Sequence, residues 1–334
     1  MKFWKLLFMN SLILGILIVI SSCSWFSMWM GLEINLLSFI PLMMKKMNSY
    51  SNESALKYFL IQVLASILLL ISIILNSYFF DFVLLNYNII LNFILYSSIM
   101  TKMGAAPFHF WFIEVIEGLN WNNSLILMTL QKISPFIIIS YTKMFFNYIY
   151  SIIIISVILS TISSMNLISL RKIMAFSSIN HMGWMLILII LNKTLWFYYL
   201  FIYCFINFLV IFIFKKNKIF YIFQLNNLEK NKFLKFILSL NILSLGGFPP
   251  FIGFYMKWIS LNFMMKYELY MLSLIMILCS LFMLFIYTRL IFFFFTIKLF
   301  EMKLKKKKIN ILFLLTNFFN ILALSLSPWL FNFF

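Results

Sequence analysis

Long apolar runs separated by short polar stretches make up nearly the whole chain of 334 residues. A helix that crosses a bilayer needs roughly 20 mostly apolar residues. On that measure the pattern predicts eleven spans, at residues 4–22, 25–44, 56–77, 88–112, 122–146, 149–168, 173–191, 194–214, 235–260, 268–297 and 309–330. The longest connection, from Lys215 to about Leu234, is too short for a soluble domain. We therefore expect an all-α polytopic membrane protein with a single transmembrane domain over residues 1–334.

The composition agrees with lipid as the solvent of this fold. Hydrophobic residues make up 64% of the chain and charged residues only 10%, whereas a soluble domain carries roughly 25% charged residues. The net charge of +18 would suggest nucleic acid in a soluble protein. In a membrane protein, basic residues gather in loops on one side of the bilayer, so no nucleic-acid partner is expected.

The apolar N-terminal run from Met1 to Ile20 resembles a signal peptide only in part. No small-residue cleavage site follows it, and further spans do, so we expect it to stay as the first helix. The abundant Phe and Met residues share AT-rich codons with Ile, Asn and Lys. Their abundance is therefore not taken as a sign of function.

The distribution of basic residues tests the span count. If the N-terminus faces the negative side of the membrane, nineteen Lys and Arg residues fall on that side and three on the other. The first group comprises Lys2, Lys5, Lys45, Lys46, Lys57, Arg171, Lys172, Lys215, Lys216, Lys218, Lys230, Lys232, Lys235, Lys298, Lys303 and Lys305 to Lys308, and the second Lys143, Lys193 and Lys266. By the positive-inside rule, this predicts an N-terminus in the cytoplasm or matrix and a C-terminus on the opposite side.

Four charged residues remain within apolar spans and are not explained by this rule. Glu33, Lys102, Lys132 and Lys257 each lie well inside a predicted helix, whereas Arg289 is close enough to a helix end to reach the interface. A charge at mid-bilayer costs about 2.5–3.5 kcal/mol on insertion scales. Four such residues would be a large penalty for a protein, so they must face one another, water or both.

The simplest interpretation of these charges is an ion pair between Glu33 and one lysine that ties two helices together. It does not account for the set, because one carboxylate cannot neutralise three lysines. Buried lysines without full partners can be neutral or charged near physiological pH. Such groups can take up and release protons, which is the chemistry of a proton relay.

Two of the lysines lie beside predicted helix breaks. Gly104 and Pro107 follow Lys102, and Gly246, Gly247, Pro249, Pro250 and Gly253 precede Lys257. Proline interrupts a helix, and inside a membrane the freed backbone groups need protein or water around them. The breaks fall in the fourth and ninth spans, which is typical of transporters with inverted repeats. We expect repeats at about 1–146 and 149–297, with 309–330 as an extra helix, although ordinary kinks remain an alternative.

Two histidines are further candidates. His181 lies in an apolar span, where a packing role competes with a bridging role in a relay, because imidazole titrates near neutrality. His109, just after Pro107, is a weaker candidate. Their separate spans argue against haem ligation.

Other chemistry is not indicated. Glu114 and Glu117 can share one helical face and are expected to be a solvated pair. Cys23, Cys204 and Cys279 are far apart, so neither a disulfide framework nor an iron–sulfur site is predicted. No phosphate-binding glycine loop, Ser/His/Asp array or metal-ligand cluster occurs. We expect no catalytic or redox centre, no metal and no cofactor in this chain.

Five segments resemble the antiporter-like membrane subunits of mitochondrial NADH:ubiquinone oxidoreductase (complex I), specifically the subunit 2 family in its animal form. They are residues 31–35 (GLEIN), 102–111 (KMGAAPFHFW), 131–135 (QKISP), 178–184 (SINHMGW) and 246–254 (GGFPPFIGF). The resemblance covers nearly the whole chain, and the AT-rich composition suits an animal mitochondrial gene, such as an insect's. Bacterial members have fourteen helices and the animal form lacks the first three, in agreement with the predicted eleven.

The resemblance implies roles at matching positions. Glu33 is the carboxylate that tunes the proton affinity of Lys102, Lys132 is the central relay lysine, and Lys257 is the distal lysine on the second broken helix. His181 is a tentative relay residue.

The resemblance also implies partners, cofactors and location. The partners are other membrane-arm subunits, including neighbouring antiporter-like ones, and lipids such as cardiolipin. FMN, iron–sulfur clusters and ubiquinone belong to other subunits, where quinone reduction supplies the energy. The location is the mitochondrial inner membrane, with the N-terminus in the matrix and the C-terminus in the intermembrane space.

Two rival functions stay open at the level of sequence. A free-standing monovalent cation/proton antiporter of the same superfamily would share the charges and the broken helices, but would work without a respiratory complex. A membrane scaffold would use the buried charges only to lock helices together.

Overall fold

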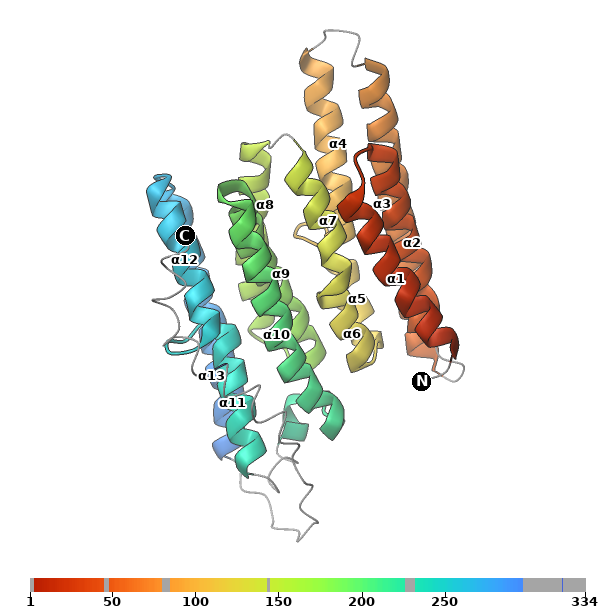
Figure 1. The fold of residues 1–334 in the computed structure, drawn as a ribbon. Coiled ribbons are helices and arrows are strands. Elements are labelled where there is room, and N and C mark those ends of the chain that lie inside the picture. The colour runs from red at the N-terminus through yellow and green to blue at the C-terminus, as the bar shows by residue number, and fades with distance from the viewer. Residues whose placement is uncertain are drawn as a thin grey trace. The chain divides into compact units, whose positions relative to one another are not determined.

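The computed structural model describes residues 3–44, 48–79, 85–142, 145–225, 232–296 and 320, and these residues are predominantly α-helical (Figure 1). The helices in chain order are α1 (Phe3–Ser21), α2 (Trp25–Met43), α3 (Ser49–Phe79), α4 (Leu85–Met103), α5 (Phe110–Gly118), α6 (Trp121–Met128), α7 (Leu130–Tyr141), α8 (Phe146–Ser164), α9 (Leu170–Leu191), α10 (Lys193–Asn217), α11 (Lys232–Gly246), α12 (Ile252–Lys266) and α13 (Tyr270–Thr296).

The helices agree with the predicted membrane spans. Within the described residues, eight helical stretches are long and apolar enough to cross a bilayer. The predicted spans 88–112 and 235–260 are each divided into two helices, α4 with α5 and α11 with α12. The span 309–330 lies outside the described residues apart from Asn320, as does the basic run Lys305–Lys308. The count of eleven therefore stays a prediction.

Three details of the predicted spans are wrong. The span 122–146 is interrupted at Thr129, between α6 and α7, and ends at Tyr141. The span 56–77 begins later than the helix it predicts, since α3 starts at Ser49 and Lys57 lies in its third turn. The span 235–260 also begins later than its helix, since α11 starts at Lys232, and Lys235 within it is 8% exposed. Lysine has good helix propensity, so its charge alone does not mark a helix boundary.

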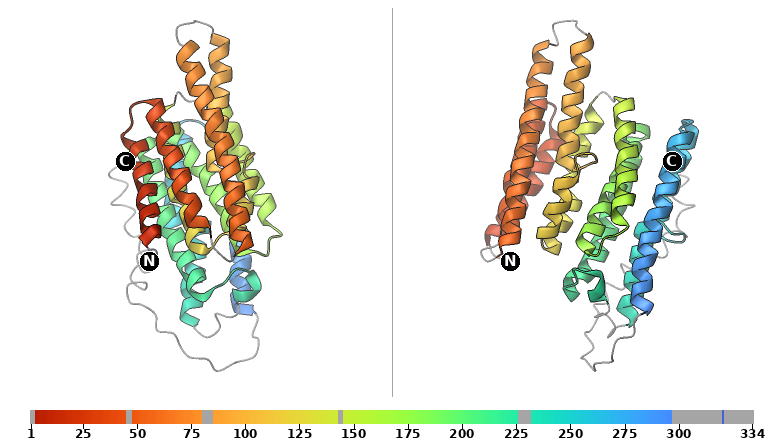
Figure 2. Two further views of the ribbon diagram at one scale, coloured as in Figure 1. Left: turned by 90° about the vertical axis from the view of Figure 1, so that its right-hand side faces the viewer. Right: turned by 180° about the vertical axis from the view of Figure 1, so that it is seen from behind.

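The chain divides into two compact units, residues 1–156 and 157–334. In the first unit α1 packs along α2, α3 packs against α2, α4 and α5, and α7 contacts α1, α2, α4 and α6. In the second unit α9 contacts α10 and α12, and α11 packs against α10, α12 and α13. Further views of these helices are given in Figure 2. The expected inverted relation between repeats at 1–146 and 149–297 stays a prediction, as does the single domain.

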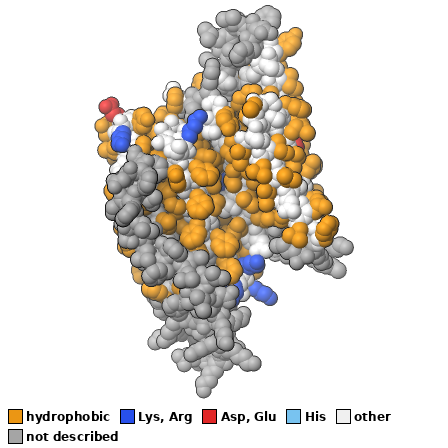
Figure 3. Space-filling view, in the orientation of Figure 1, with side chains coloured by type: hydrophobic (Ala, Val, Ile, Leu, Met, Phe, Trp, Pro, Cys, Tyr) orange, Lys and Arg blue, Asp and Glu red, His pale blue; other side chains and the backbone are white. Residues whose placement is uncertain are grey.

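Many serine hydroxyls within the helices bond their own helix. The hydroxyls of Ser72, Ser98 and Ser156 each donate to the carbonyl oxygen three residues earlier, at 2.7, 2.7 and 2.9 Å. In lipid, such groups have no water to bond. Hydrophobic side chains cover much of the described surface seen in Figure 3, with few basic groups among them. This surface suits a lipid solvent.

Candidate functional site

The first break places Lys102 at the end of α4. The helix stops because Gly104 adopts φ +73°, which L side chains rarely take, and the amides of Gly104 and Ala105 both donate to the Met100 carbonyl at 3.0 and 3.1 Å. A Cβ at Gly104 would also lie only 2.9 Å from Cβ of Phe112. The chain resumes as α5 at Phe110, so Lys102 lies one turn before an irregular segment.

The freed carbonyls of this break have specific partners. The indole of Trp111 donates to the Thr101 oxygen at 3.0 Å, and the Gln62 amide donates to the Lys102 oxygen at 3.1 Å. Backbone groups at a membrane break must be satisfied by protein or water. Because Trp111 and Gln62 do this, the Lys102 ammonium is left for other contacts.

The ammonium of Lys102 forms an ion pair with Glu33 of α2. Nζ lies 3.7 Å from Oε1 of Glu33, and the two side chains are 3% and 21% exposed. The distance is that of an ion pair rather than of a short hydrogen bond, and Glu33 Oε1 has no hydrogen-bond donor among the described residues. The pair is therefore largely buried but not tightly bonded.

Lys132 lies in the first turn of α7, just after the interruption at Thr129. It is 2% exposed, and its ammonium lies 5.1 Å from the centre of the Phe112 ring. A cation over an aromatic ring is stabilised by the ring quadrupole. Phe112 thus connects the Lys132 ammonium to α5, the second half of the broken segment.

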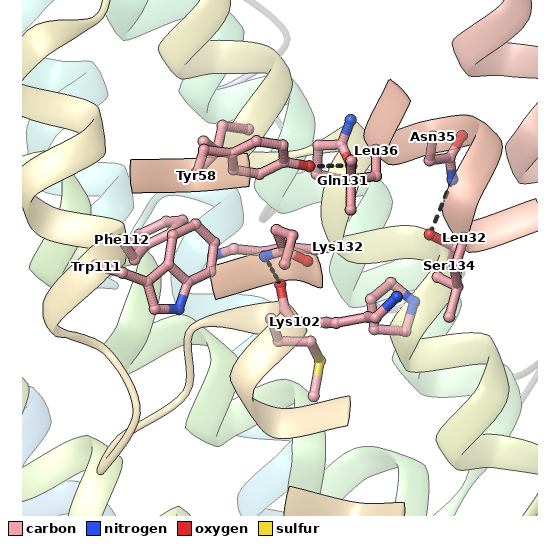
Figure 4. A pocket seen from close by; sticks show the side chains of 14 residues that line it. Leu32, Asn35, Leu36, Tyr58, Lys102, Trp111, Phe112, Gln131, Lys132 and Ser134 are labelled. Carbon is pink, nitrogen blue, oxygen red and sulfur yellow. Dashed lines mark hydrogen bonds between the residues drawn. The ribbon is translucent and has the colours of Figure 1, made fainter. Parts of the chain in front are cut away.

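Lys102 and Lys132 line the same pocket, shown in Figure 4. The space that the centre of a water molecule can occupy in this pocket is about 20 Å³. This is enough for at least one water. The wall also includes polar side chains that reach across helices: Tyr58 donates to Gln131 at 3.5 Å, and Asn35 donates to Ser134 at 3.2 Å. The site is buried, polar and able to hold water.

The second unit holds Lys257 beside the other break. Its Nζ donates to the Gly246 carbonyl at 2.9 Å, at the C-terminal end of α11, and lies 5.8 Å from the centre of the Trp184 ring of α9. Gly247 follows with φ +75°, and a Cβ there would lie 2.9 Å from Cδ of Lys257. A helix C-terminus carries a partial negative charge. Lys257 therefore has a backbone and a ring as neighbours where Lys102 has a carboxylate.

His181 lies on α9 one turn before Trp184. Its Nδ1 is 2.8 Å from the Tyr199 hydroxyl of α10, and it is 7% exposed. The second unit thus brings His181 within one helical turn of the ring that contacts Lys257. Glu33, Lys102 and Lys132 come together in the first unit, and in the second Lys257 of α12 contacts α9, the helix that carries His181.

The remaining candidates have structural contacts. His109 Nδ1 lies 3.2 Å from the Pro107 carbonyl within the break. Glu114 forms an exposed ion pair with Lys57 at 2.8 Å, and Lys57 also contacts Glu53 at 3.0 Å. Arg289 donates to the carbonyl of Met165, just after the end of α8, so its expected reach to the interface stays a prediction.

Several residues of the site were not predicted from the sequence. Gln62 bonds the Lys102 carbonyl and Tyr199 bonds His181, whereas Asn35 bonds Ser134 and Gln131 bonds Tyr58 in the wall of the pocket. Gln62 and Asn35 could have been found in the sequence, because each is an amide side chain inside a strongly apolar span. Tyr199 carried no such signal, since tyrosine is common throughout the chain.

The described residues do not suit an iron–sulfur cluster or a metal ion. Among them no group of three or more His, Cys, Asp or Glu side chains comes together, and the three cysteines are free. Iron–sulfur clusters are held by four ligands, mostly cysteine thiolates. The lysine, glutamate and histidine side chains at these positions are groups that can bind and release protons.

The chain is similar to known membrane proteins over most of its length. A family model described as NADH:quinone oxidoreductase/Mrp antiporter, TM, matches residues 22–283. NADH-ubiquinone oxidoreductase chain 2 of Anopheles gambiae is 49% identical over 259 residues, which are 76% of this chain and 74% of the relative. The protein of the same name from Locusta migratoria is 41% identical over 289 residues, covering 86% of this chain and 84% of the relative.

Solved structures share the fold at low sequence identity. A chain of respiratory complex I from Thermus thermophilus superposes with a TM-score of 0.83 at 19% identity and covers 98% of this chain and 80% of its own. A chain of the Mrp complex from Dietzia sp. gives a TM-score of 0.76 at 15% identity, over 86% of this chain and 60% of its own.

Proposed function

The chain belongs to the NADH:quinone oxidoreductase/Mrp antiporter transmembrane family, and we propose that it translocates protons as a membrane-arm subunit of a respiratory NADH:ubiquinone oxidoreductase. Its curated insect relatives carry the name of such a subunit. The energy comes from quinone reduction in other subunits.

One observation supports this function above the others. Lys102 and Lys132 line a single buried pocket, and Glu33 lies 3.7 Å from Lys102. Two buried amines in one small polar pocket can exchange protons through a water molecule, whereas an interhelical tie needs only one lysine.

The mechanism is electrostatic. A displacement of Glu33 relative to Lys102 changes the free energy of the charged lysine, because Coulomb interactions are strong in a poorly hydrated site. A proton released there can reach Lys132 through water in the shared pocket. The polar groups of Tyr58, Gln131 and Ser134 line that path.

The second unit supplies the distal part of the relay. Lys257 holds its proton against the Gly246 carbonyl and the Trp184 ring, and His181 lies one turn away along α9. A lysine whose ammonium is held by a carbonyl loses that bond when the carbonyl shifts. Movement between α11 and α12 would therefore change the charge state of Lys257.

The proposal extends to cofactors, partners and location. FMN, iron–sulfur clusters and ubiquinone belong to other subunits of the complex. The partners are other membrane-arm subunits, including neighbouring antiporter-like subunits, and lipids such as cardiolipin, with no nucleic acid. The location is the mitochondrial inner membrane, with the N-terminus in the matrix and the C-terminus in the intermembrane space.

Native gel electrophoresis of detergent-solubilised membranes tests membership of the complex. We expect the chain to migrate with a large assembly that oxidises NADH. Migration apart from any NADH-oxidising band, with cation/proton exchange by the purified chain alone, would favour the free-standing antiporter instead.

A double replacement tests the relay against a scaffold. In Glu33→Leu/Lys102→Leu, both members of the ion pair become apolar, so a purely structural pair can be replaced without loss. We expect the complex to assemble but its NADH-driven proton translocation to fall to a small fraction of normal. Normal proton translocation in the assembled double variant would refute the relay.

A further inference from the structure

α9 and α10 enclose polar side chains around His181 that the lysine relay leaves unused. The His181 ring lies beside Tyr199 and Tyr203, which are one turn apart on α10, with ring centroids 6.0 and 5.0 Å away. The Tyr199 hydroxyl is 2.8 Å from His181 Nδ1. Tyr199 is only 2% exposed and Tyr203 3%. This contact is therefore removed from bulk water.

The direction of this hydrogen bond follows from the phenol. Among the described residues, the hydrogen bond recorded for the Tyr199 hydroxyl is the one to His181 Nδ1. If Nδ1 donated the proton, the buried phenolic O–H would be left without an acceptor, which is unfavourable. Tyr199 therefore donates and Nδ1 accepts, so the proton of neutral His181 is on Nε2.

This tautomer determines how His181 can gain a proton. In a neutral imidazole with its proton on Nε2, the basic lone pair is on Nδ1, and the Tyr199 hydroxyl occupies it. We propose that Tyr199 is a relay residue through whose hydroxyl His181 receives its proton. The inference rests on the proposed relay function and extends it by one residue.

The step balances with a hydronium ion as the proton donor. The hydronium ion gives a proton to the Tyr199 oxygen and becomes water, while the Tyr199 O–H bond breaks and an Nδ1–H bond forms on His181. The phenol is unchanged overall, and His181 becomes an imidazolium. Release of the Nε2 proton to the next acceptor leaves a neutral ring with its proton on Nδ1, and turning of the ring with the Tyr199 hydroxyl restores the starting tautomer.

The polar line continues past Tyr199 along α10. Asn207 follows Tyr203 by one further turn, is 0% exposed, and lies beside the Tyr203 hydroxyl together with Ser178 of α9. Neither polar atom of the Asn207 side chain completes a hydrogen bond of good geometry among the described residues. A buried amide in this condition is a typical site for an ordered water. A water bound there would lie beside the Tyr203 hydroxyl, one turn of α10 from Tyr199.

Titratable groups face His181 from each helix packed around it. Tyr199 and Tyr203 come from α10, and Lys257 of α12 contacts Trp184, one turn away on α9. Tyr287 of α13 lies close enough to Tyr199 and Tyr203 to interact with both electrostatically.

Tyr199→Phe tests the proposal because it removes only the hydroxyl. Tyr198→Phe is the matched control, since Tyr198 is the neighbouring residue and is 49% exposed. In the assembled complex we expect coupled NADH:ubiquinone turnover to fall by about tenfold or more in Tyr199→Phe, because a positioned proton donor contributes on the order of 100-fold to a proton transfer. The pH–rate profile should shift to lower pH, because the hydroxyl bonds the imidazolium more strongly than the neutral ring and the variant loses both bonds.

Each other outcome has a definite meaning. An unchanged turnover and pH profile in Tyr199→Phe would overturn the proposal, as would failure of this variant to assemble, since the hydroxyl would then be needed for folding. If His181→Gln lowers turnover and Tyr199→Phe does not, this inference alone fails. Failure of the proposed function would appear separately, as normal proton translocation in Glu33→Leu/Lys102→Leu.

Discussion

The three proposed relay lysines differ in the group that lies next to the ammonium. Lys102 has the carboxylate of Glu33, Lys132 has the ring of Phe112, and Lys257 has the Gly246 carbonyl with the ring of Trp184. Only the first neighbour carries a full charge. The charge state of Lys102 should therefore respond most strongly to substitution of its partner.

Glu33→Gln removes that charge while keeping the size and shape of the side chain. We expect coupled NADH:ubiquinone turnover of the assembled complex to fall at least about fivefold, which corresponds to about 1 kcal/mol. Glu114→Gln is the matched control, because Glu114 also contacts a lysine but is 57% exposed at its side chain. Exposed ion pairs contribute little, so the control should keep normal turnover, and an equal loss in both variants would contradict this role of Glu33.

The sequence indicated which charged residues matter but not how they are held. The positive-inside rule separated Glu33, Lys102, Lys132 and Lys257 from the loop residues, because the rule depends only on the order of spans. The contacts of Gln62 with the Lys102 carbonyl and of Tyr199 with His181 depend on which helices pack together. No local pattern reports those long-range contacts.

At the scale of helices, the two broken segments differ in how their halves are joined. In the first, Trp111 of α5 bonds the Thr101 carbonyl at the end of α4. In the second, α12 approaches α11 so closely that a Cβ at Gly253 would lie 1.7 Å from the Ser244 carbonyl oxygen. This crossing therefore requires glycine, and it sets the distance from α12 to the end of α11, where Lys257 binds.

Gly253→Ala should disrupt the contact between α11 and α12. The Ser244 carbonyl belongs to the backbone and cannot move aside as a flexible side chain can. We therefore expect the variant to lose about 2 kcal/mol or more of stability, which is at least as much as typical overpacking of a core costs. The measurement is the midpoint of thermal inactivation of the complex. Gly246→Ala is the comparison, because its Cβ would meet a Tyr287 ring carbon at 3.1 Å and a small shift relieves that contact. Equal stability of Gly253→Ala and the unmodified chain would contradict the close crossing.

Helix breaks were predictable where glycine and proline mark them. Gly104 with Pro107, and Gly246 with Pro249, stand at the two breaks that the sequence indicated. The interruption at Thr129 has neither residue type: Thr129 has φ −118° and ψ −76°, and its hydroxyl donates to the Leu125 carbonyl at 2.7 Å. The Thr129 amide also donates to the Leu125 carbonyl, at 3.0 Å, and a search for glycine and proline does not detect an interruption of this kind.

For the whole molecule, the asymmetry of basic residues predicts a definite orientation in the inner membrane. A short epitope tag at the N-terminus should resist protease in mitoplasts, whose intermembrane face is open, and become sensitive when the membrane is dissolved. A C-terminal tag should be cleaved in mitoplasts directly. The reverse pattern would contradict the orientation inferred from the loop lysines.

The central claim is that buried lysines of this chain carry protons while the energy comes from elsewhere in the complex. The most direct test is the number of protons translocated per NADH oxidised, measured in vesicles that contain the complex with Lys132→Ala. Lys216→Ala, at an exposed position in the last turn of α10, is the control. We predict that the Lys132→Ala complex assembles with a lower coupled rate or fewer protons per NADH, and that the control is normal. A normal rate together with a normal proton yield in Lys132→Ala would contradict the account.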